Sequence, residues 1–403
     1  MKSGLLSTTC WLSLMVAPVT PVAQTQKPQH PHYTIIDLGP SSTPFSQASS
    51  VNNIGLVSGV AAVPDGAQHA VLWFKRSLFD IATPGLEGPN SGAASVNESG
   101  QVVGQAETSH TDPNDENSCG YGTGLRCLPF LWEYGKTYAL PLLGGHNGSA
   151  SQINSRGEAA GYAENGVRDP ECPTGARVNG TGPQVLDFEA VVWGPRQGEI
   201  RELHPLPGDT VGVALGINDD GQAVGSSGSC ANTVIPPFAA GFHAVLWDKD
   251  GSAHDLGNLG GTGNPDLLAI GNIANAINNR GQVAGVSAMS GNTTTHAFLW
   301  TRERGKMLDL GTLSGDVNSA ALGINDRGDV VGASLGAAGP IHGNPRAFLW
   351  RNGMMTDLND LIPANSPLHL LTAFGINDAG EIVGFGVTNT GDLHAFLATP
   401  RDR

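Results

Sequence analysis

Apolar residues in this sequence occur in short runs that are separated at regular places by Asn and Gly. Seven times, an Asn is followed three residues later by a Gly and four residues further on by a second Gly. An Asn that opens a type I turn can accept a hydrogen bond from the backbone two residues on, and the first Gly can take the left-handed conformation. Apolar flanks such as Ile324 and Val330 therefore predict a strand, a turn and a second strand. The seven asparagines are Asn52, Asn97, Asn154, Asn218, Asn278, Asn325 and Asn377.

Each repeat continues into a third apolar run, such as residues 296–300, and a fourth, clearest at residues 307–311. The second glycine of the motif lies inside a strand, which predicts a bulge or a close backbone approach. Six of the third runs end in Trp, and these tryptophans follow one another at intervals of 50 to 61 residues. Four strands per unit at this spacing indicate a propeller blade with loop insertions. We expect the aromatic side chains to pack between neighbouring units. They are Trp73, Trp132, Trp193, Trp247, Trp300 and Trp350, with Ala398 in the seventh unit.

The two ends of the repeat region complement one another. Residues 33–39 read as a fourth strand with no earlier strands to join, and residues 394–397 read as a third strand with no fourth strand after it. Pairing the two would complete a seventh blade and remove exposed sheet edges. We therefore predict one all-β domain over residues 33–400, a seven-bladed β-propeller of four-stranded antiparallel blades closed by the N-terminal strand. A stacked solenoid, which would not need this exchange, is the second choice.

The recurrent Ile-Asn-Asp-x-Gly-x-Val-Val-Gly and His-Ala-Phe-Leu-Trp segments resemble the HAF repeats of bacterial extracellular proteins, over nearly the whole chain from residue 33. That resemblance implies an exported repeat protein but no activity, because the family has no assigned function. The form Asn-x-x-Gly-Gln-x-x-Gly is also similar to repeats of the regulator of chromosome condensation type, which implies a propeller. The leading His occurs as His69, His243, His296 and His394, and is replaced by Leu128, Glu189 and Arg346.

The first residues have the pattern of an export signal. Lys2 supplies a positive charge, residues 5–17 are largely apolar, and Ala23 is a small residue before a polar stretch. We predict a signal peptide at residues 1–23, a polar linker at 24–32, and a secreted or periplasmic protein. Because the apolar run is short and broken, we expect no membrane span. The alternative is a cytoplasmic protein with an unusual N-terminus.

The cysteine count fits an exported chain. Cys10 would leave with the signal, so four cysteines remain, and four cysteines allow three pairings in an oxidising compartment. We favour Cys119 with Cys127 and Cys172 with Cys230. Free, buried thiols are the alternative.

The composition and net charge limit the kinds of partner that we expect this protein to bind. The net charge is −15, which opposes binding to nucleic acid. Glycine is abundant at 56 residues and only 14% of the residues are charged, which suits many short strands and tight turns. We expect a monomer whose partner is an extracellular ligand such as a glycan or a peptide.

The repeats differ most between their second and third strands, and loops on a rigid scaffold often carry function. This stretch is long in units two, three and four, at about residues 106–127, 163–188 and 227–242. We predict that these loops project from one face as a disulfide-braced binding surface for a glycan, a peptide or a cation held by carboxylates. We predict no cofactor, with calcium as an unsupported option, and the alternative is solvated loops without a ligand. The candidate binding residues are Asp112, Asp115, Glu116, Tyr121, Arg126, Arg168, Asp169 and Glu171.

No set of acid, base and nucleophile can be assembled from the sequence. The repeated histidines belong to different blades and would lie around a ring, so we interpret them as structural. The Gly-x-Ser-x-Gly pattern at residues 332–336 falls on a repeat glycine, not on a strand-to-helix turn. A non-catalytic binding or surface-interaction scaffold is therefore favoured. The alternative is an extracellular enzyme, a hydrolase or lyase acting on polysaccharide or another polymer, with carboxylates such as Asp112, Asp169 and Asp209 brought together across blades.

Overall fold

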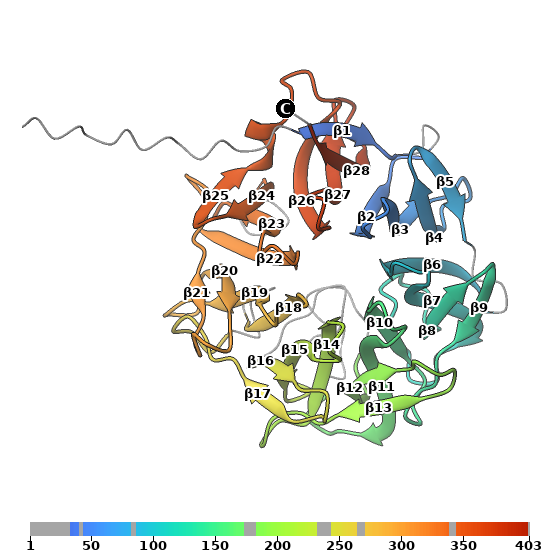
Figure 1. The fold of residues 1–403 in the computed structure, drawn as a ribbon. Helices are drawn as coiled ribbons and strands as arrows, with labels where there is room; N and C mark the ends of the chain where they lie inside the picture. The colour runs from blue at the N-terminus through green and yellow to red at the C-terminus, as the bar shows by residue number, and fades with distance from the viewer. Residues whose placement is uncertain are drawn as a thin grey trace, which may run out of the picture. The chain divides into compact units, whose positions relative to one another are not determined.

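The computed structural model describes residues 33–39, 43–81, 86–172, 183–231, 243–263, 271–337 and 344–401. These residues belong to one compact unit, His32–Arg403. The predicted signal peptide and linker lie outside the described residues. The described strands form seven four-stranded antiparallel sheets arranged as the blades of a propeller, as Figure 1 shows. The predicted fold class is confirmed.

The first four blades follow the chain without interruption. Blade 1 consists of β2 (Ser46–Val51), β3 (Leu56–Ala62), β4 (Gln68–Phe74) and β5 (Ser77–Asp80). Blade 2 consists of β6 (Glu87–Val96), β7 (Val102–Thr111), β8 (Leu125–Glu133) and β9 (Lys136–Ala139). Blade 3 consists of β10 (Gly148–Ile153), β11 (Ala159–Arg168), β12 (Leu186–Trp193) and β13 (Ile200–Leu203). Blade 4 consists of β14 (Val211–Ile217), β15 (Ala223–Gly228), β16 (His243–Trp247) and β17 (Ala253–Asp255).

The last three blades include the closure of the ring. Blade 5 consists of β18 (Ile273–Ile277), β19 (Val283–Ala288), β20 (Thr295–Trp300) and β21 (Leu308–Asp309). Blade 6 consists of β22 (Asn318–Ile324), β23 (Val330–Leu335), β24 (Arg346–Arg351) and β25 (Met354–Asp357), followed by the short 3-10 helix η1 (Leu358–Leu361). Blade 7 consists of β26 (Leu368–Ile376), β27 (Ile382–Thr388), β28 (Leu393–Pro400) and the N-terminal strand β1 (Tyr33–Asp37).

The ring closes as the chain ends predict. Strand β1 pairs antiparallel with β28, in a register that runs from Tyr33 opposite Pro400 to Asp37 opposite Phe396. The N-terminal strand is thus the outer strand of a sheet whose other members come from the C-terminus (Figure 1). Tyr33 is fully buried against blade 6. The closure prediction is confirmed.

The repeated asparagine forms the predicted turn and also bonds to the next blade. In blade 6, Oδ1 of Asn325 accepts hydrogen bonds from the backbone N–H groups of Arg327 and Asp329, at 3.1 and 2.9 Å. Gly328 takes the left-handed conformation with φ of 84°. The Nδ2 group of each of the seven asparagines then donates to the backbone carbonyl of the corresponding asparagine in the next blade, at 2.8 to 3.2 Å. The seventh bond, from Asn377 to Asn52, closes a continuous ring that we call the asparagine ring.

The second glycine of the motif is required by a close backbone approach. A Cβ atom added to Gly332 would lie 1.9 Å from the carbonyl oxygen of Ala320 on the paired strand. The bulge lies on that partner strand, between Ala321 and Gly323. The two predicted features therefore occur together, one on each strand of the hairpin.

The hydrophobic core lies between blades. Each cluster of buried apolar residues joins two neighbouring blades, and the tryptophans take part in these clusters. Trp193 of blade 3 is 1% exposed, and its Nε1 donates to the carbonyl of Pro141 after blade 2, at 2.7 Å. The prediction that the tryptophans pack between units is confirmed.

Candidate functional site

The described parts of the three long loops lie at one end of the propeller. Because successive strands of a blade are antiparallel, every connection from the second to the third strand is at the end opposite the asparagine turns. Strand β7 continues to Thr111 and β11 to Arg168, so the loops are shorter than predicted, at residues 112–124, 169–185 and 229–242. Of these, 173–182 and 232–242 lie outside the described residues. We call residues 112–124, 168–172, 183–185 and 229–231 the loop face.

Two of the predicted site residues are buried between blades 2 and 3. Asp112 and Glu116 are 2% and 0% exposed, and both accept hydrogen bonds from the Nδ2 group of Asn147, at 3.0 and 3.4 Å. The same amide group lies 3.2 Å from both carboxylate oxygens of Glu164, which is also fully buried. Glu116 further accepts the backbone N–H of Val185, at 2.6 Å. Three carboxyl groups thus converge on one amide and hold the loop of blade 2 against blade 3.

Burial keeps this cluster partly protonated. Desolvation, and after it the charge of Glu116, raises the pKa of Glu164 to about 8. Desolvation also raises the pKa of Glu116. A protonated carboxyl can donate a hydrogen bond to its neighbour, which offsets part of the cost of burying like charges. The cluster is therefore built to hold the loop in place, and these two acids are not presented to solvent.

Sequence reasoning missed Asn147 and Glu164, although a signal for them exists. Asn147 stands seven residues before the repeat asparagine and Glu164 stands ten after it, and blade 2 has Asn90 and Glu107 at the same offsets. Nδ2 of Asn90 donates to Glu107, at 2.7 Å. This pairing of amide and acid in the two blades with long second strands could have been read from the aligned repeats.

The remaining predicted residues differ in exposure. Asp115, Arg168 and Glu171 are exposed, and Nη2 of Arg168 donates to Oδ1 of Asn114, at 2.9 Å, across from blade 3 to the loop of blade 2. Burial, and then the charge of Glu107, raises the pKa of Tyr121 above its ordinary range. Arg126 is partly buried, and its Nε has no hydrogen-bond partner among the described residues.

Asp169 lies where blades 3 and 4 meet. Its Oδ2 accepts the hydroxyl of Thr210, at 3.3 Å. Desolvation, followed by the charge of Asp169 and a hydrogen bond to it, raises the pKa of Asp187 to about 6. The structure thus forms a pair of acids from Asp169 and Asp187, whereas Asp112 lies in the cluster around Asn147.

Asp209, the third acid named for the possible enzyme, is bonded to two neighbouring side chains. Its Oδ2 lies 2.9 Å from Nδ1 of His243 and also accepts the hydroxyl of Ser227. Ser227 is fully buried and bonds to the acid, not to the histidine. A histidine that activated this serine as a nucleophile would have to contact it, so the arrangement is not that of a catalytic triad.

Three of the four repeated histidines contact an acid on the fourth strand of their own blade, whereas His243 contacts Asp209 in the connection before blade 4. Nδ1 of His296, for example, lies 2.9 Å from Asp309 on the fourth strand, and Arg346 of blade 6 contacts Asp357 in the same way, at 3.0 Å. These pairs support the structural interpretation. Blade 3 is different, because Glu189 replaces the histidine. Burial, and then the charge of Glu202, raises the pKa of Glu189 to about 8.

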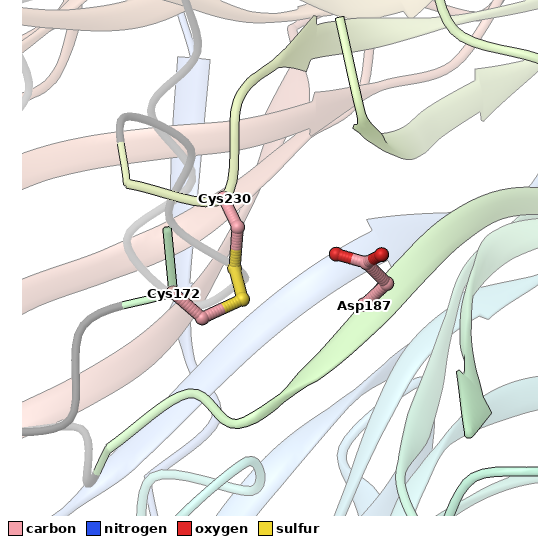
Figure 2. A group of neighbouring side chains, drawn as sticks. All are labelled: Cys172, Asp187 and Cys230. Atoms are coloured by element: carbon pink, nitrogen blue, oxygen red, sulfur yellow. A yellow bond between two sulfur atoms is a disulfide. The ribbon is translucent and has the colours of Figure 1, made fainter. Parts of the chain in front are cut away.

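Both favoured disulfides are present. Cys119 is bonded to Cys127 within the loop of blade 2, and Cys172 is bonded to Cys230, which joins the loops of blades 3 and 4. Figure 2 shows Asp187 beside the second bridge. Within the described residues, Cys172, Asp187 and Cys230 are the one group of three whose ligand atoms all lie within 4.8 Å of one another. Because the two sulfurs are bonded to each other, they offer no thiolate to a metal in this state.

A polar cavity of about 200 Å³ opens on the propeller axis beside the asparagine ring. A second one of about 180 Å³ shares Ser50, Gln152 and other residues with it. The residues that follow the asparagines include four acids around the first cavity, and each accepts a backbone N–H from the preceding blade, as Asp326 does from Asn279, at 2.8 Å. These acids connect the turns, and no His or Tyr lines either cavity among the described residues. The four acids are Glu98, Asp219, Asp326 and Asp378.

Comparisons with known proteins bear on the fold. No family model matches the sequence, and no curated protein matches it significantly. The β-propeller domain of the Trilobed protease from Pyrococcus furiosus is similar, with a TM-score of 0.50 at 10% identity, over 90% of this chain and 95% of that one. An oligogalacturonate lyase in complex with manganese matches with a TM-score of 0.44 at 12% identity, over 92% and 97%. Trypanosoma rangeli sialidase matches with a TM-score of 0.41 at 10% identity, over 92% of this chain and 60% of that one.

At 10% identity the likeness to the first of these structures concerns the fold alone. The sheets and the ring closure define the chain as a seven-bladed β-propeller scaffold. Along the described part of the chain, no helix has the length and apolar character needed to cross a membrane.

Proposed function

We propose that this protein is an exported, non-catalytic binding scaffold that contacts its ligand through the loop face. The observation that carries the proposal is that the described parts of the loops of three consecutive blades are tied to one another. Cys172 is bonded to Cys230 between blades 3 and 4, and Arg168 bonds to Asn114 between blades 3 and 2. Residues held by such connections lose little conformational entropy when a ligand binds, which favours affinity.

The exposed residues of the loop face suit a polar ligand. Arg168 supplies a planar donor, and Asp115 and Glu171 supply acceptors, at a surface where buried acids already fix the backbone. Hydroxyl groups of a glycan, or the main-chain amides of a peptide, could bond to such mixed charges. Glu116 and Asp112 would then support the surface from beneath without touching the ligand.

Export and family are part of the proposal. Two disulfides are typical of proteins that fold in an oxidising compartment, and the first residues have the composition of a leader. The repeat motifs resemble the HAF repeats of bacterial extracellular proteins. On these grounds we infer a secreted or periplasmic monomer of that group.

The test is a ligand screen followed by matched variants. Purified protein is applied to glycan and peptide arrays, with and without calcium, and the affinity for each hit is measured by calorimetry. We expect Arg168→Ala to weaken binding at least tenfold. Arg302→Ala is the control. Arg302 also bonds to a side chain of a neighbouring blade, Asp248 at 2.8 Å, but it follows a third strand, at the end of the propeller opposite the loop face. Equal loss in both variants, or loss only in Arg302→Ala, would place the ligand elsewhere.

A second candidate is an enzyme acting on an extracellular polymer, and one observation favours it. Asp187, with its raised pKa of about 6, is partly protonated near neutrality and bonds to a second acid, Asp169. Glycoside hydrolysis uses one protonated and one ionised carboxyl group, but with about 5–10 Å between them. The two acids, which are in contact here, would therefore have to separate to accept a sugar. Under this candidate Asp187→Asn abolishes cleavage of a bound polymer while binding persists. If no bound glycan is ever shortened by the wild-type protein, the binding scaffold stands alone.

A further inference from the structure

The group formed by Cys172, Cys230 and Asp187 combines a disulfide with a carboxyl group that lacks a full set of partners. Figure 2 shows the carboxyl group of Asp187 directed toward the sulfur atoms. The two sulfurs and one carboxylate oxygen lie within 4.8 Å of one another. The three residues come from the loop of blade 3, from β12 and from the loop of blade 4.

The carboxyl group of Asp187 is poorly satisfied. Its Oδ1 is buried without a hydrogen-bond partner among the described residues. The side chain that it contacts is a second acid, Asp169, which supplies no positive charge to balance a carboxylate. A buried carboxylate oxygen without a donor is unfavourable unless a proton or a cation is supplied.

We propose that reduction of the Cys172–Cys230 disulfide creates a binding site for Zn²⁺, with the two thiolates and Asp187 as protein ligands. Two sulfurs and one oxygen are ligands that zinc accepts, and a fourth position would remain for water. Ligand atoms of a tetrahedral zinc site lie roughly 3–4 Å apart, so the carboxylate and sulfur atoms already have nearly the required spacing. Once their bond is broken, the sulfurs can separate by side-chain rotation. This inference goes beyond the proposed binding function.

The chemistry balances in two steps. A water-soluble trialkylphosphine breaks the sulfur–sulfur bond, and with one water it yields two thiols and a phosphine oxide. The phosphorus is oxidised by two electrons and the disulfide is reduced by two. Zn²⁺ then replaces the two thiol protons and is held by the carboxylate, so proton release accompanies binding. Reduction would exchange a covalent connection between blades 3 and 4 for a metal-mediated one.

The other disulfide provides a matched control. Cys119 and Cys127 form no ligand group of this kind with a described acid. All proteins in the series, the reference included, carry Cys10→Ser, so that the four cysteines of the two disulfides are the only source of thiols after reduction. The variants are C172S/C230S, C119S/C127S and Asp187→Asn, each prepared oxidised and phosphine-reduced.

The experiment measures bound zinc by equilibrium dialysis and affinity by competition with a chromophoric chelator. We expect one Zn²⁺ per reduced chain, none per oxidised chain, none in C172S/C230S, and unchanged binding in C119S/C127S. Asp187→Asn should weaken binding at least tenfold. Zinc that binds the oxidised chain, that survives C172S/C230S, or that is indifferent to Asp187→Asn overturns the proposal.

A second measurement does not depend on variants folding. Co²⁺ added to the reduced wild-type chain should show the intense d–d bands of a tetrahedral thiolate site, and addition of Zn²⁺ should abolish them. Weak octahedral bands alone would overturn the proposal. Neither result depends on whether a glycan or a peptide binds the loop face, so the proposed function is tested separately.

Discussion

Replacing Asn325 with Ala tests the asparagine ring. The side chain is 4% exposed and makes four hydrogen bonds, with the N–H groups of Arg327 and Asp329, the carboxylate of Asp329 and the carbonyl of Asn377 in the next blade. At a net 0.5–1.5 kcal/mol for each of the four bonds, the loss in the free energy of unfolding is about 2–6 kcal/mol. For a unit the size of His32–Arg403, the entropy of unfolding is about 0.8 kcal/mol/K at roughly 2.1 cal/mol/K per residue. The melting temperature should therefore fall by about 3–8 °C.

Differential scanning calorimetry measures this shift, with Asn258→Ala as the control. Asn258 is an exposed turn residue whose Oδ1 accepts one local hydrogen bond, from Gly260 at 2.9 Å. Its replacement should lower the melting temperature by about 1 °C or less. If Asn325→Ala melts no lower than Asn258→Ala, the bonds of the ring do not stabilise the fold and the reasoning is refuted.

Three further predictions concern the cluster, the core and the cysteines. Because the folded-state pKa of Glu164 is raised from 4.5 to about 8, the folded chain keeps a proton that the unfolded chain loses. The resulting stability is complete below about pH 4.5 and is lost as the pH rises through about 8. The melting temperature of the wild-type protein should therefore fall as the pH is raised from 5 to 9, and Glu164→Gln should reduce this pH dependence. A wild-type melting temperature that does not change with pH would contradict the raised pKa. Trp193→Ala should lower the free energy of unfolding, measured by urea titration, by about 3–5 kcal/mol. Replacing the exposed aromatic residue Phe79 with Ala should lower it by about 0.5 kcal/mol. Equal losses in the two variants would argue against packing of Trp193 between blades. Non-reducing peptide mapping should find Cys119 linked to Cys127 and Cys172 linked to Cys230, and any other linkage would remove the bracing of the loop face.

The fold could be predicted because its determinants are local and repeated. The spacing from Asn325 to Gly328 and Gly332 indicates a turn and a close backbone approach within one hairpin. Seven copies of this hairpin in one chain are compatible with few architectures. Ring closure followed from the unpaired strand patterns at the two ends. The hydrogen bond from each asparagine to the next blade was not predicted. The sequence of one repeat does not show which atom of the neighbouring repeat lies beside its Nδ2 group.

The candidate site was only partly accessible from sequence, for a physical reason. Long loops carry polar residues whether those residues face solvent or a buried network. Asp112 and Glu116 looked like ligand-binding acids, but they contact Asn147 of the next blade. Asp187 was not singled out, because it becomes notable only when Cys172 and Cys230, far from it in sequence, are brought beside it.

Closure of the ring by the N-terminal strand is the claim on which the account of the fold depends. Thr34 lies opposite Thr399 in the register of β1 and β28, so cysteines at these two positions can test the pairing directly. Thr388, which pairs with Leu368 on β26, serves as the mismatched partner in a second double variant, Thr34→Cys with Thr388→Cys.

Mass spectrometry of oxidised, non-reduced peptides then gives the decisive result. If β1 pairs with β28, an intramolecular disulfide forms between positions 34 and 399 and none forms between 34 and 388. Equal crosslinking of both pairs, or bonds only between separate molecules, would show that the N-terminal strand does not complete the seventh blade.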